Sequence, residues 1–403
     1  MVLIEKDYEI GGLLKTFNFN GFLFDFGPHI FRSKDEKVMK FVKTLLRNNY
    51  LQVNSNPAIF KYGKFFDNVI PVITWKNIEK LPREKKNKVL KEIRNTDKPR
   101  NCNCFKNFED CIISQIGETL YWEFFRDYSK KWWGINLKKL SADLAPKNLR
   151  IGGEKFYGHL TTNFERLNEE IYPVRGGIFE IARKLGEKVR KLGGSFLLNS
   201  NIKSLECDGE RVSKIIIETI EEEVEIDSCE NLIVSTIPLP SLCKMLNIKF
   251  KDILYRSEIC IFIKLNGKQM FKHSWIYFHD PEIIFSRIYE PLYYNKYAAP
   301  KGFTSLCVEV TCFENDKIWN DKHLGEKVID QLIDTGIIKR SQEPEVLGIA
   351  KYPYAYPIYT VDYKQKLREI FDKLKIYENL RIIGRTGSFS YLNMWECLKW
   401  AVY

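Results

Sequence analysis

Apolar residues recur along much of the chain at intervals of three and four positions, which is the spacing of one face of a helix. Over residues 35–46 this spacing predicts a helix, and over residues 178–192 it predicts a longer helix that ends at Gly193-Gly194. Residues from about 75 to 148 have a mostly helical pattern with many charged and aromatic positions. A last helix is predicted from about Asn393 to the end of the chain.

Short apolar runs between these helices predict strands. The predicted strands cover residues 1–5, 21–26, 195–198, 212–217, 231–236 and 380–383. The first is expected to be buried and to end in an acid. Asp208-Gly209 is expected to form a hairpin between the strands at 195–198 and 212–217. Residues 255–353 contain further short β-like runs, and the alternation of strands with helices indicates an α/β fold.

Length and charge add two constraints. The chain has 403 residues, which is more than one hydrophobic core usually serves, so two domains are expected. The net charge is +11, but the basic residues are spread along the chain and mixed with acids. A solvated basic surface is therefore the prediction, and no nucleic-acid partner is expected. A small molecule that carries phosphate would be attracted by the same charge.

The ten cysteines have no paired spacing typical of a metal site, so no metal is predicted. No signal peptide is expected, because Glu5, Lys6 and Asp7 interrupt the first apolar run, and no apolar run approaches the roughly 20 residues that span a bilayer. These features predict reduced thiols and a cytoplasmic protein without a transmembrane segment. The sequence does not predict an oligomeric state.

Two glycine turns are candidates for a dinucleotide site. Glu5 ends the first predicted strand, where a carboxylate could accept hydrogen bonds from ribose hydroxyls, and Gly11-Gly12 would let backbone N–H groups approach a pyrophosphate. Residues 384–387 join a buried strand to a helix, so their N–H groups could face a flavin carbonyl while Arg385 pairs with a phosphate. A simple turn and a capped surface helix are the respective alternatives.

Several separated segments resemble one family of FAD enzymes, the amine oxidase superfamily that includes UDP-galactopyranose mutase and protoporphyrinogen oxidase. The resemblance rests on residues 4–6, 10–12, 24–31, 128–134, 172–178, 234–238 and 384–394, which follow each other in family order. It implies a Rossmann-like FAD-binding domain and a discontinuous α+β substrate domain. The FAD-binding domain would comprise residues 1–35, 173–250 and 376–403, and the substrate domain would comprise residues 36–172 and 251–375.

The resemblance also implies roles for individual residues. Glu5 would hold the ribose, Gly11 and Gly12 would line the pyrophosphate, and Ile202 would meet the adenine through its backbone. The residues expected around the flavin and phosphates are Gly27, Pro28, His29, Gly384, Arg385 and Met394. The candidates on the substrate side are His29, Trp133, Arg150, Arg175, Tyr354 and Tyr356, of which His29, Arg150, Arg175 and Tyr354 are the predicted catalytic groups. Residues 352–357 could wall the flavin or belong to ordinary packing.

The sequence departs from the family pattern at two places. The family begins with a strand and a Gly-x-Gly-x-x-Gly loop, whereas this chain begins at the second strand, so a truncated chain is expected. Arg32 stands where the mutases have a second histidine. The predicted function is an FAD-dependent oxidoreductase that transfers a hydride from a small-molecule substrate, such as an amine or a tetrapyrrole-like compound, to flavin N5. The alternatives are a mutase that isomerises a nucleotide sugar, and a non-catalytic remnant of the fold.

Overall fold

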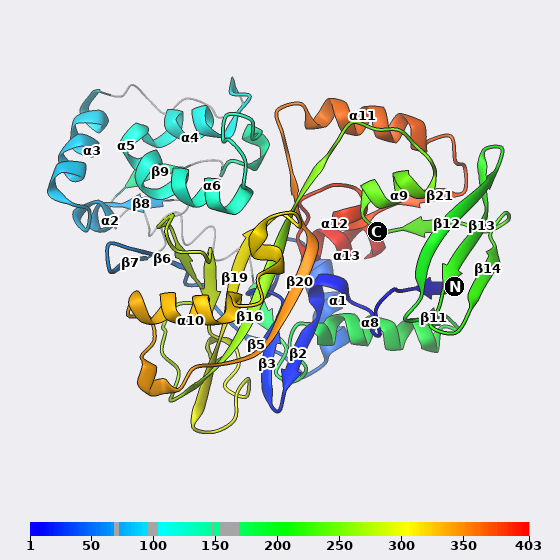
Figure 1. Cartoon of the computed structure of the whole chain (residues 1–403), viewed down its shortest axis with the longest axis horizontal. Coiled ribbons are helices and arrows are strands. Elements are labelled where there is room, and N and C mark those ends of the chain that lie inside the picture. Colours follow the sequence, from blue (N-terminus) through cyan, green and yellow to red (C-terminus); the bar gives the residue numbers. More distant parts are fainter. Residues whose placement is uncertain (68–71, 96–103, 147–148, 153–168, 403) are drawn as a thin grey trace.

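The computed structural model describes residues 1–67, 72–95, 104–146, 149–152 and 169–402 (Figure 1). Its largest element is a seven-stranded mixed sheet with the order β20-β16-β19-β18-β17-β6-β7. These strands are β6 (Ala58–Lys61), β7 (Lys64–Asp67), β16 (Leu254–Asn266), β17 (Ile276–Phe278), β18 (Arg287–Tyr289), β19 (Phe303–Cys312) and β20 (Glu345–Ile358).

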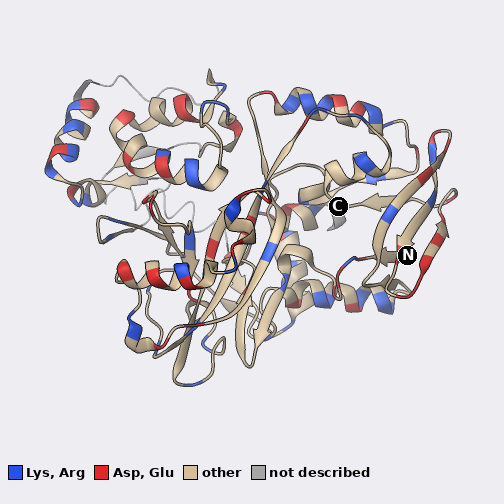
Figure 2. Ribbon diagram, viewed as in Figure 1, with Lys and Arg blue, Asp and Glu red and all other residues tan. Residues whose placement is uncertain are grey.

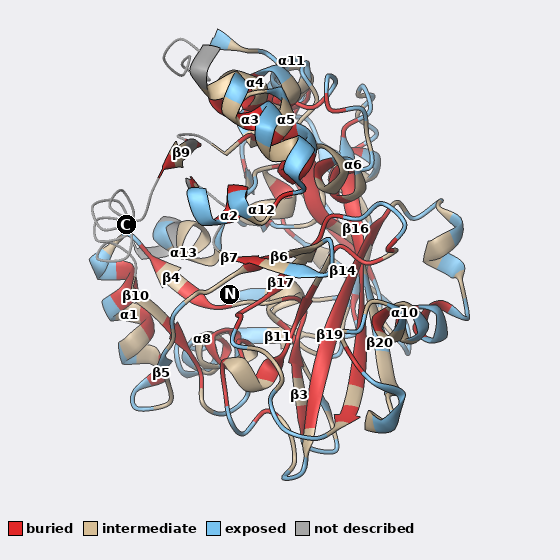
Figure 3. Cartoon of the chain, turned by 90° about the vertical axis from the view of Figure 1, so that its left-hand side faces the viewer, coloured by how far each residue is buried: buried red, intermediate tan, exposed pale blue. Residues whose placement is uncertain are grey.

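The prediction of short strands over residues 255–353 is wrong for β16, β19 and β20, which have 13, 10 and 14 residues. Nearly every position of β16 and β19 is buried (Figure 3). Because both faces of these strands are covered, they lack the alternation of apolar and polar residues by which a half-buried strand is recognised. Their polar members, such as Glu258 and Glu309, break the apolar runs and make the strands look shorter in sequence.

Two pairs of parallel strands lie on the other side of the molecule. β1 (Val2–Ile4) pairs with β11 (Ser195–Leu197), and β15 (Ile233–Ser235) pairs with β21 (Leu380–Ile382). Among the described residues β1 and β21 have no second partner strand. Val2 is consequently 52% exposed, so the prediction that the first strand is buried is wrong.

A three-stranded antiparallel sheet lies beside these pairs (Figure 1, right). It consists of β12 (Asn201–Asp208), β13 (Arg211–Glu218) and β14 (Glu223–Asp227). Asp208-Gly209 does form a hairpin, but it joins β12 to β13. The predicted pairing of residues 195–198 with 212–217 is therefore wrong, because residues 195–197 pair with β1 instead. β12 was not predicted, because its residues are largely exposed, several of them are charged, and they do not form an apolar run.

Three helices confirm the predictions made from apolar spacing. α1 (Glu36–Leu46), α8 (Phe179–Lys191) and α13 (Met394–Val402) share one apolar core. Asp35 caps α1, since its carboxylate accepts hydrogen bonds from the backbone N–H groups of Lys37 (3.0 Å) and Val38 (3.2 Å). The side chains of α1 and α8 meet because each helix has a single apolar stripe.

A separate group of helices forms the upper left of Figure 1 and has its own core. These helices are α2 (Trp75–Glu79), α3 (Arg83–Asn95), α4 (Phe108–Ile116), α5 (Glu118–Tyr121) and α6 (Asp127–Trp133). Elsewhere α9 (Leu239–Met245) and α11 (Tyr363–Leu374) share a core with β21, and α10 (Leu324–Asp334) packs against the large sheet. Basic and acidic residues are interspersed on α3 and α11 (Figure 2).

The remaining elements are short. They are β2 (Thr16–Phe19), β3 (Phe22–Asp25), β4 (Phe31–Ser33), β5 (Leu51–Gln52), β8 (Val72–Thr74), β9 (Arg150–Gly152), β10 (Glu169–Tyr172) and α12 (Gly384–Gly387). The predicted strand at residues 21–26 is β3, and the predicted turn at residues 384–387 is the one-turn helix α12. Residues 151–158 are rich in glycine and are predicted from the sequence to be a connector, but most of them lie outside the described residues.

A buried carboxylate fixes the start of α8. Asp25 accepts hydrogen bonds from the Thr16 hydroxyl (2.6 Å), the Tyr172 phenol (2.7 Å) and the Ile178 backbone N–H (3.1 Å). Burial raises the pKa of Asp25 to about 6, although these three hydrogen bonds lower it. The turn before α8 is thus held against the β2–β3 hairpin, from which residues 27–29 continue.

Two further expectations can be compared with the structure. Cys111 takes part in a disulfide, so the prediction of reduced thiols is wrong for this residue, while eight other cysteines are free. Within the described part of the chain, no helix has both the length and the apolar character that crossing a membrane requires.

Candidate functional site

The predicted site begins with two residues from opposite ends of the chain. His29 follows β3, and Arg385 lies in α12 immediately after β21. Burial lowers the pKa of His29 to about 3, and the positive charges of Arg287 and Arg385 lower it further. The imidazole is therefore neutral at physiological pH, and both guanidinium groups are near enough to act on it.

Three buried polar atoms of this region have no hydrogen-bond partner among the described residues. They are Nδ1 of His29, Nε of Arg385 and Oγ of Ser235. Ser235 ends β15, the strand that pairs with β21 ahead of Arg385. Buried polar atoms in native proteins are nearly always satisfied, so this group of atoms is typical of a site that holds a polar ligand.

Aromatic side chains form a wall beside Arg385. Its guanidinium lies 5.0 Å from the ring centre of Tyr356 and 4.4 Å from that of Tyr391. The two tyrosine rings stack at 5.8 Å, and Tyr356 also contacts Trp132 at 5.1 Å. Trp132, Tyr356 and Tyr391 form this aromatic wall, and Trp133 lies beside it with its ring 6.3 Å from that of Tyr391.

A buried ion pair lies against Gly27. Arg287 Nε donates to Glu309 Oε1 at 2.7 Å, and Arg287 Nη2 donates to Glu309 Oε2. Gly27 has a φ of +91°, and a Cβ built on it would stand 3.4 Å from Glu309 Oε2 and 3.6 Å from Arg287 Nη2. Glycine therefore allows residues 27–29 to run close over the ion pair. The guanidinium also lies 5.0 Å from the ring of Trp132, which connects the pair to the aromatic wall.

The residues predicted to meet the ribose and pyrophosphate lie at the end of β1. The Glu5 carboxylate accepts a hydrogen bond from the Asp7 backbone N–H at 3.0 Å. Gly12 has a φ of +54°, and no atom lies within 4 Å of the place where its Cβ would stand. The charges of Glu5 and Arg385 both act on the Tyr352 hydroxyl, whose pKa burial raises to about 12. The two ends of the predicted cofactor site thus approach the same strand, β20.

Other predicted residues are more scattered. Tyr354 packs edge-on against Tyr255 at 5.3 Å, in the core below α9, while its neighbour Tyr356 belongs to the aromatic wall. Arg175 lies exposed in the turn before α8, where its backbone N–H is bonded to Asn49. Arg150 belongs to β9, but its side chain lies outside the described residues.

The last predicted residues take structural positions around these. Ile202 pairs with Ile217 in the β12–β13 hairpin, and Met394 begins α13 and packs in the core shared with α1 and α8. Pro28 is half-buried. Gly11 has a φ of +114° and Gly384 a φ of +79°, so both occupy conformations that favour glycine.

Arg32, which replaces the second histidine of the mutases, lies on β4. Its guanidinium is 3.5 Å from Glu170 Oε1 on the neighbouring strand β10 and 3.5 Å from the Ser55 hydroxyl. No hydrogen bond or ion pair joins it to His29 among the described residues. The substitution therefore builds a contact between strands.

Sequence reasoning missed Arg287, Glu309, Glu258 and Tyr391. A usable signal was present for Glu309, because it is a single charged residue inside an apolar run, whereas Arg256 and Ser257 directly precede Glu258. A charge buried in this way needs a partner, and such pairs concentrate at functional sites. The partner could not be read from sequence, since Arg287 and Glu309 meet only through the pairing of β18 with β19.

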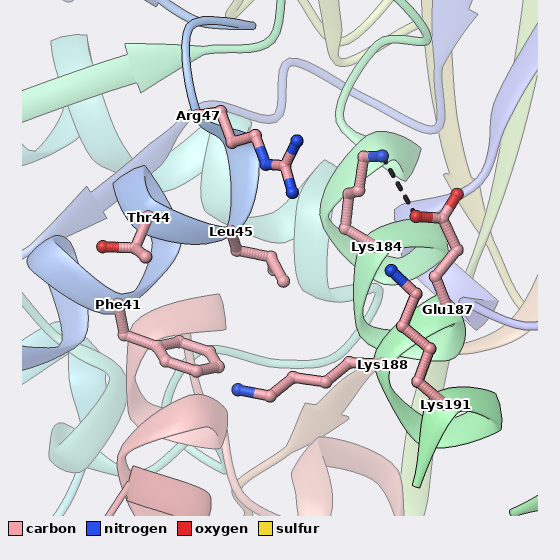
Figure 4. A pocket seen from close by; sticks show the side chains of 8 residues that line it. All are labelled: Phe41, Thr44, Leu45, Arg47, Lys184, Glu187, Lys188 and Lys191. Atoms are coloured by element: carbon pink, nitrogen blue, oxygen red, sulfur yellow. Dashed lines mark hydrogen bonds and ion pairs between the residues drawn. The ribbon is translucent and has the colours of Figure 1, made fainter.

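A groove of about 370 Å³ lies between α1 and α8 (Figure 4). It is lined by Phe41, Thr44, Leu45, Arg47, Lys184, Glu187, Lys188 and Lys191. Lys184 pairs with Glu187 at 3.0 Å, and the Lys188 ammonium lies 5.2 Å from the Phe41 ring. None of the predicted site residues lines this groove, so it is separate from the predicted site.

Comparison with known protein families gives a match to the flavin-containing amine oxidoreductases over residues 1–259. The chain belongs to this family. The predicted Rossmann-like α/β fold and the predicted cofactor, FAD, are thereby confirmed. As a member of the flavin-containing amine oxidoreductase family, the protein is an FAD-containing oxidoreductase whose subclass the match leaves open.

Solved structures share the fold of this amine oxidoreductase. A reduced UDP-galactopyranose mutase has a TM-score of 0.76 and 21% identity, over 96% of this chain and 84% of its own. A proposed protoporphyrinogen oxidase from Exiguobacterium sp. 255-15 has a TM-score of 0.68 and 13% identity, over 100% and 91%. A CLA-producing fatty acid isomerase from P. acnes has a TM-score of 0.60 and 13% identity, over 100% and 90%. At these identities the likeness extends to the fold alone.

The residues present fit a flavin. The unpartnered Nδ1 of His29 and Nε of Arg385 offer buried polar atoms, and Gly12 leaves open space beside the end of β1. A neutral imidazole and a guanidinium without a carboxylate partner among the described residues suit a ligand that combines a flat ring with phosphates.

Proposed function

We propose that this protein oxidises a small-molecule substrate bound between residues 27–29 and the aromatic wall of Trp132, Tyr356 and Tyr391. When bound, the flavin would supply the hydride acceptor at N5. The observation that supports this assignment is that Arg385 lies near enough to His29 for its charge to lower the pKa of the imidazole, and that each residue has a buried polar atom without a partner among the described residues.

The proposal assigns cofactor binding to the residues predicted from the sequence. Those residues are Glu5, Gly11, Gly12, Gly27, Pro28, His29, Ile202, Gly384, Arg385 and Met394, within the proposed FAD segments 1–35, 173–250 and 376–403. Residues 36–172 and 251–375 would form the substrate domain. The aromatic wall would exclude water from the reacting face, because its rings are mutually packed.

His29 remains the first proposed catalytic group, and it would act as a neutral imidazole. Arg150, Arg175 and Tyr354 remain candidates from the resemblance. Tyr356 is a stronger candidate than Tyr354, because Tyr356 contacts Trp132 and Tyr391 whereas Tyr354 packs on Tyr255. Alanine variants of Tyr354 and Tyr356 would rank the two.

The test of the proposed function is cofactor uptake followed by turnover. The full chain should become yellow on addition of FAD and show a flavin absorbance band after removal of free FAD. Addition of amine substrates should then bleach the band, and an artificial electron acceptor should restore it. A protein that stays colourless at saturating FAD would favour a non-catalytic remnant and would contradict the proposal.

A second function, isomerisation of a nucleotide sugar, is favoured by one feature. The Arg385 guanidinium has no carboxylate partner among the described residues and lies over two tyrosine rings. A cation beside stacked rings suits a substrate that carries both phosphate and a flat base. Tight binding of a UDP-sugar only after reduction of the flavin with dithionite would favour this function, whereas turnover with an electron acceptor would favour the oxidoreductase.

The cytoplasmic location stays part of the proposal. It is supported by the eight free cysteines, whereas the disulfide at Cys111 argues for an oxidising compartment. Fractionation of cells that produce the full chain would locate the protein directly.

A further inference from the structure

Two carboxyl groups lie buried side by side next to the proposed site. Glu258 on β16 is 2% exposed, and Glu309 on β19 is 0% exposed. In the antiparallel pairing of these strands, Glu258 lies opposite Thr311 and Glu309 lies opposite Cys260. Glu258 and Glu309 are therefore diagonal neighbours on one face of the sheet, and their carboxyl groups are close enough for a protonated one to hydrogen-bond the other. Two adjacent buried carboxylates cannot both be ionised without a large cost, so the pair must hold a proton.

The partners of each carboxyl decide where this proton resides. Both oxygens of Glu309 accept hydrogen bonds from the Arg287 guanidinium, which stabilises an ionised carboxylate. Glu258 has a weaker neutral partner, the Tyr356 phenol, at 3.3 Å from Oε1 and 3.4 Å from Oε2. Burial, the charge of Glu309 and the hydrogen bond that protonated Glu258 donates to Glu309 hold the pKa of Glu258 well above its usual range.

The other groups that face Glu258 do not supply a second cation. The neighbouring thiols belong to Cys260, Cys307 and Cys312, and burial raises the pKa of each. Arg256, two residues earlier on β16, donates to the backbone carbonyls of Lys131, Trp132 and Thr311. Arg287 is the cation whose charge acts on Glu258, and it is already paired with Glu309.

We propose that Glu258 is a permanently protonated positioning acid of this site. Its carboxylic acid donates a hydrogen bond to Glu309 and accepts one from Tyr356, so that a single side chain holds both the Arg287–Glu309 pair and the aromatic wall in place. Glu258 does not itself touch substrate. Its placement beside a flavin rests on the proposed function, but its protonation does not.

The proposal has a consequence for the substrate. The unit formed by Arg287, Glu309 and the neutral acid Glu258 carries no net charge, so Arg287 is not available to an anionic substrate. Of the two guanidinium groups that act on His29, Arg385 is then the one that can pair with an anionic group of the bound cofactor. A neutral Glu258 also spares the buried site a negative charge that would repel such an anion.

Infrared spectroscopy of the cofactor-free full chain tests the protonation. At pH 8.5 the exposed carboxylates are ionised, so a carbonyl-stretch band of a protonated carboxylic acid should come from Glu258. The band should disappear in Glu258→Gln and persist in the control Asp25→Asn, which alters a buried carboxylate with different partners. Absence of the band from the wild-type protein, or its persistence in Glu258→Gln, would overturn the proposal.

A pair of variants tests the positioning role. Glutamine reproduces a protonated acid, because its amide can donate to Glu309 and accept from Tyr356, whereas leucine can do neither. Glu258→Gln should retain the Tm of the wild type and its FAD affinity, and Glu258→Leu should lose at least tenfold in FAD affinity. Equal behaviour of the two variants would contradict the positioning role.

The two tests separate this inference from the proposed function. If the wild type takes up no FAD, the proposed function fails, while the infrared band and the Tm comparison still decide the state of Glu258. If Glu258→Leu does not fold, the comparison of the wild type with Glu258→Gln remains, since only a neutral acid can be replaced by glutamine without a change in Tm between pH 6 and 8.5.

Discussion

The phenol of Tyr172 donates a hydrogen bond of 2.7 Å to Asp25 Oδ2, across 147 positions of sequence. Tyr172 ends β10, immediately before the turn into α8, and Asp25 ends β3, immediately before residues 27–29. The bond therefore connects α8, which lies beside β1 and β11, to residues 27–29, which approach the Arg287–Glu309 pair. One buried carboxylate thus orients two parts of the proposed site.

Asp25 should make stability depend on pH. Burial raises its pKa from the ordinary 3.8 to about 6, so between these pH values the native state keeps a proton that the unfolded chain has released. The free energy of unfolding should consequently fall by up to about 3 kcal/mol as the pH rises from 4 to 7. Asp25→Asn should remove this decline, as measured by urea unfolding at several pH values. An unchanged profile in the variant would contradict the assignment.

His29 should act in the opposite direction. Its pKa is lowered to about 3 by burial and by two arginines, so between pH 3 and 6.5 the unfolded chain binds a proton that the native state does not. The contribution of His29 to stability is therefore present above pH 6.5 and lost as the pH falls towards 3. His29→Asn should reduce this loss of stability as the pH falls. The exposed His323, replaced in the same way, serves as the control and should leave the profile as it is.

The turn before α8 should not accept a side chain. Gly177 has a φ of +59°, and a Cβ on it would collide with the Thr16 hydroxyl and stand 2.7 Å from Asp25 Oδ1. Gly177→Ala should cost about 1 kcal/mol for the backbone conformation and a further 1–3 kcal/mol for the collision. Gly193→Ala is the matched control, because Gly193 has a φ of +83° and no atom within 4 Å of its Cβ position. Equal losses in chemical denaturation would show that Thr16 and Asp25 move aside.

Arg385 should contribute to FAD binding through a charge-assisted contact. Arg385→Met should weaken binding by about 1.5–3 kcal/mol, or roughly 10- to 100-fold. Titration of the cofactor-free protein, followed by flavin fluorescence, would measure the change. Arg381→Met is the control, since Arg381 is exposed on β21 and, within the described part of the chain, its guanidinium donates only to the carbonyls of Glu378 and Leu380. Equal FAD affinities for the two variants would exclude Arg385 from the cofactor site.

Much of this architecture could be predicted from the sequence where the information is local. α1 and α8 were predictable because each buries one stripe of residues at helical spacing. Residues 27–29 and 384–387 were predicted to lie in a flavin site because these segments resemble those of the FAD enzymes, and the left-handed φ of Gly27 and Gly384 explains why glycine stands in both. His29 and Arg385 were therefore identified before their proximity was known.

The remainder depends on pairing between distant strands. Glu309 meets Arg287 through β18 and β19, and Glu258 through β16 and β19, at separations that no local pattern encodes. Strands buried on both faces also carry no alternating pattern, so the lengths of β16 and β19 were underestimated. Tyr354 and Tyr356 are both aromatic and only two positions apart, and only the packing assigns them to different cores.

The unshared edges of β1 and β21 have a consequence for the energetics of the whole protein. Amide groups along these edges that lack a partner should exchange hydrogen with solvent rapidly, which would make the two parallel pairs the first cooperative unit to open. A ligand that binds only the closed form raises stability in proportion to the logarithm of its concentration. The concentration of FAD would then determine how much of the protein is folded. Cofactor supply would thus limit the amount of the enzyme as well as its activity.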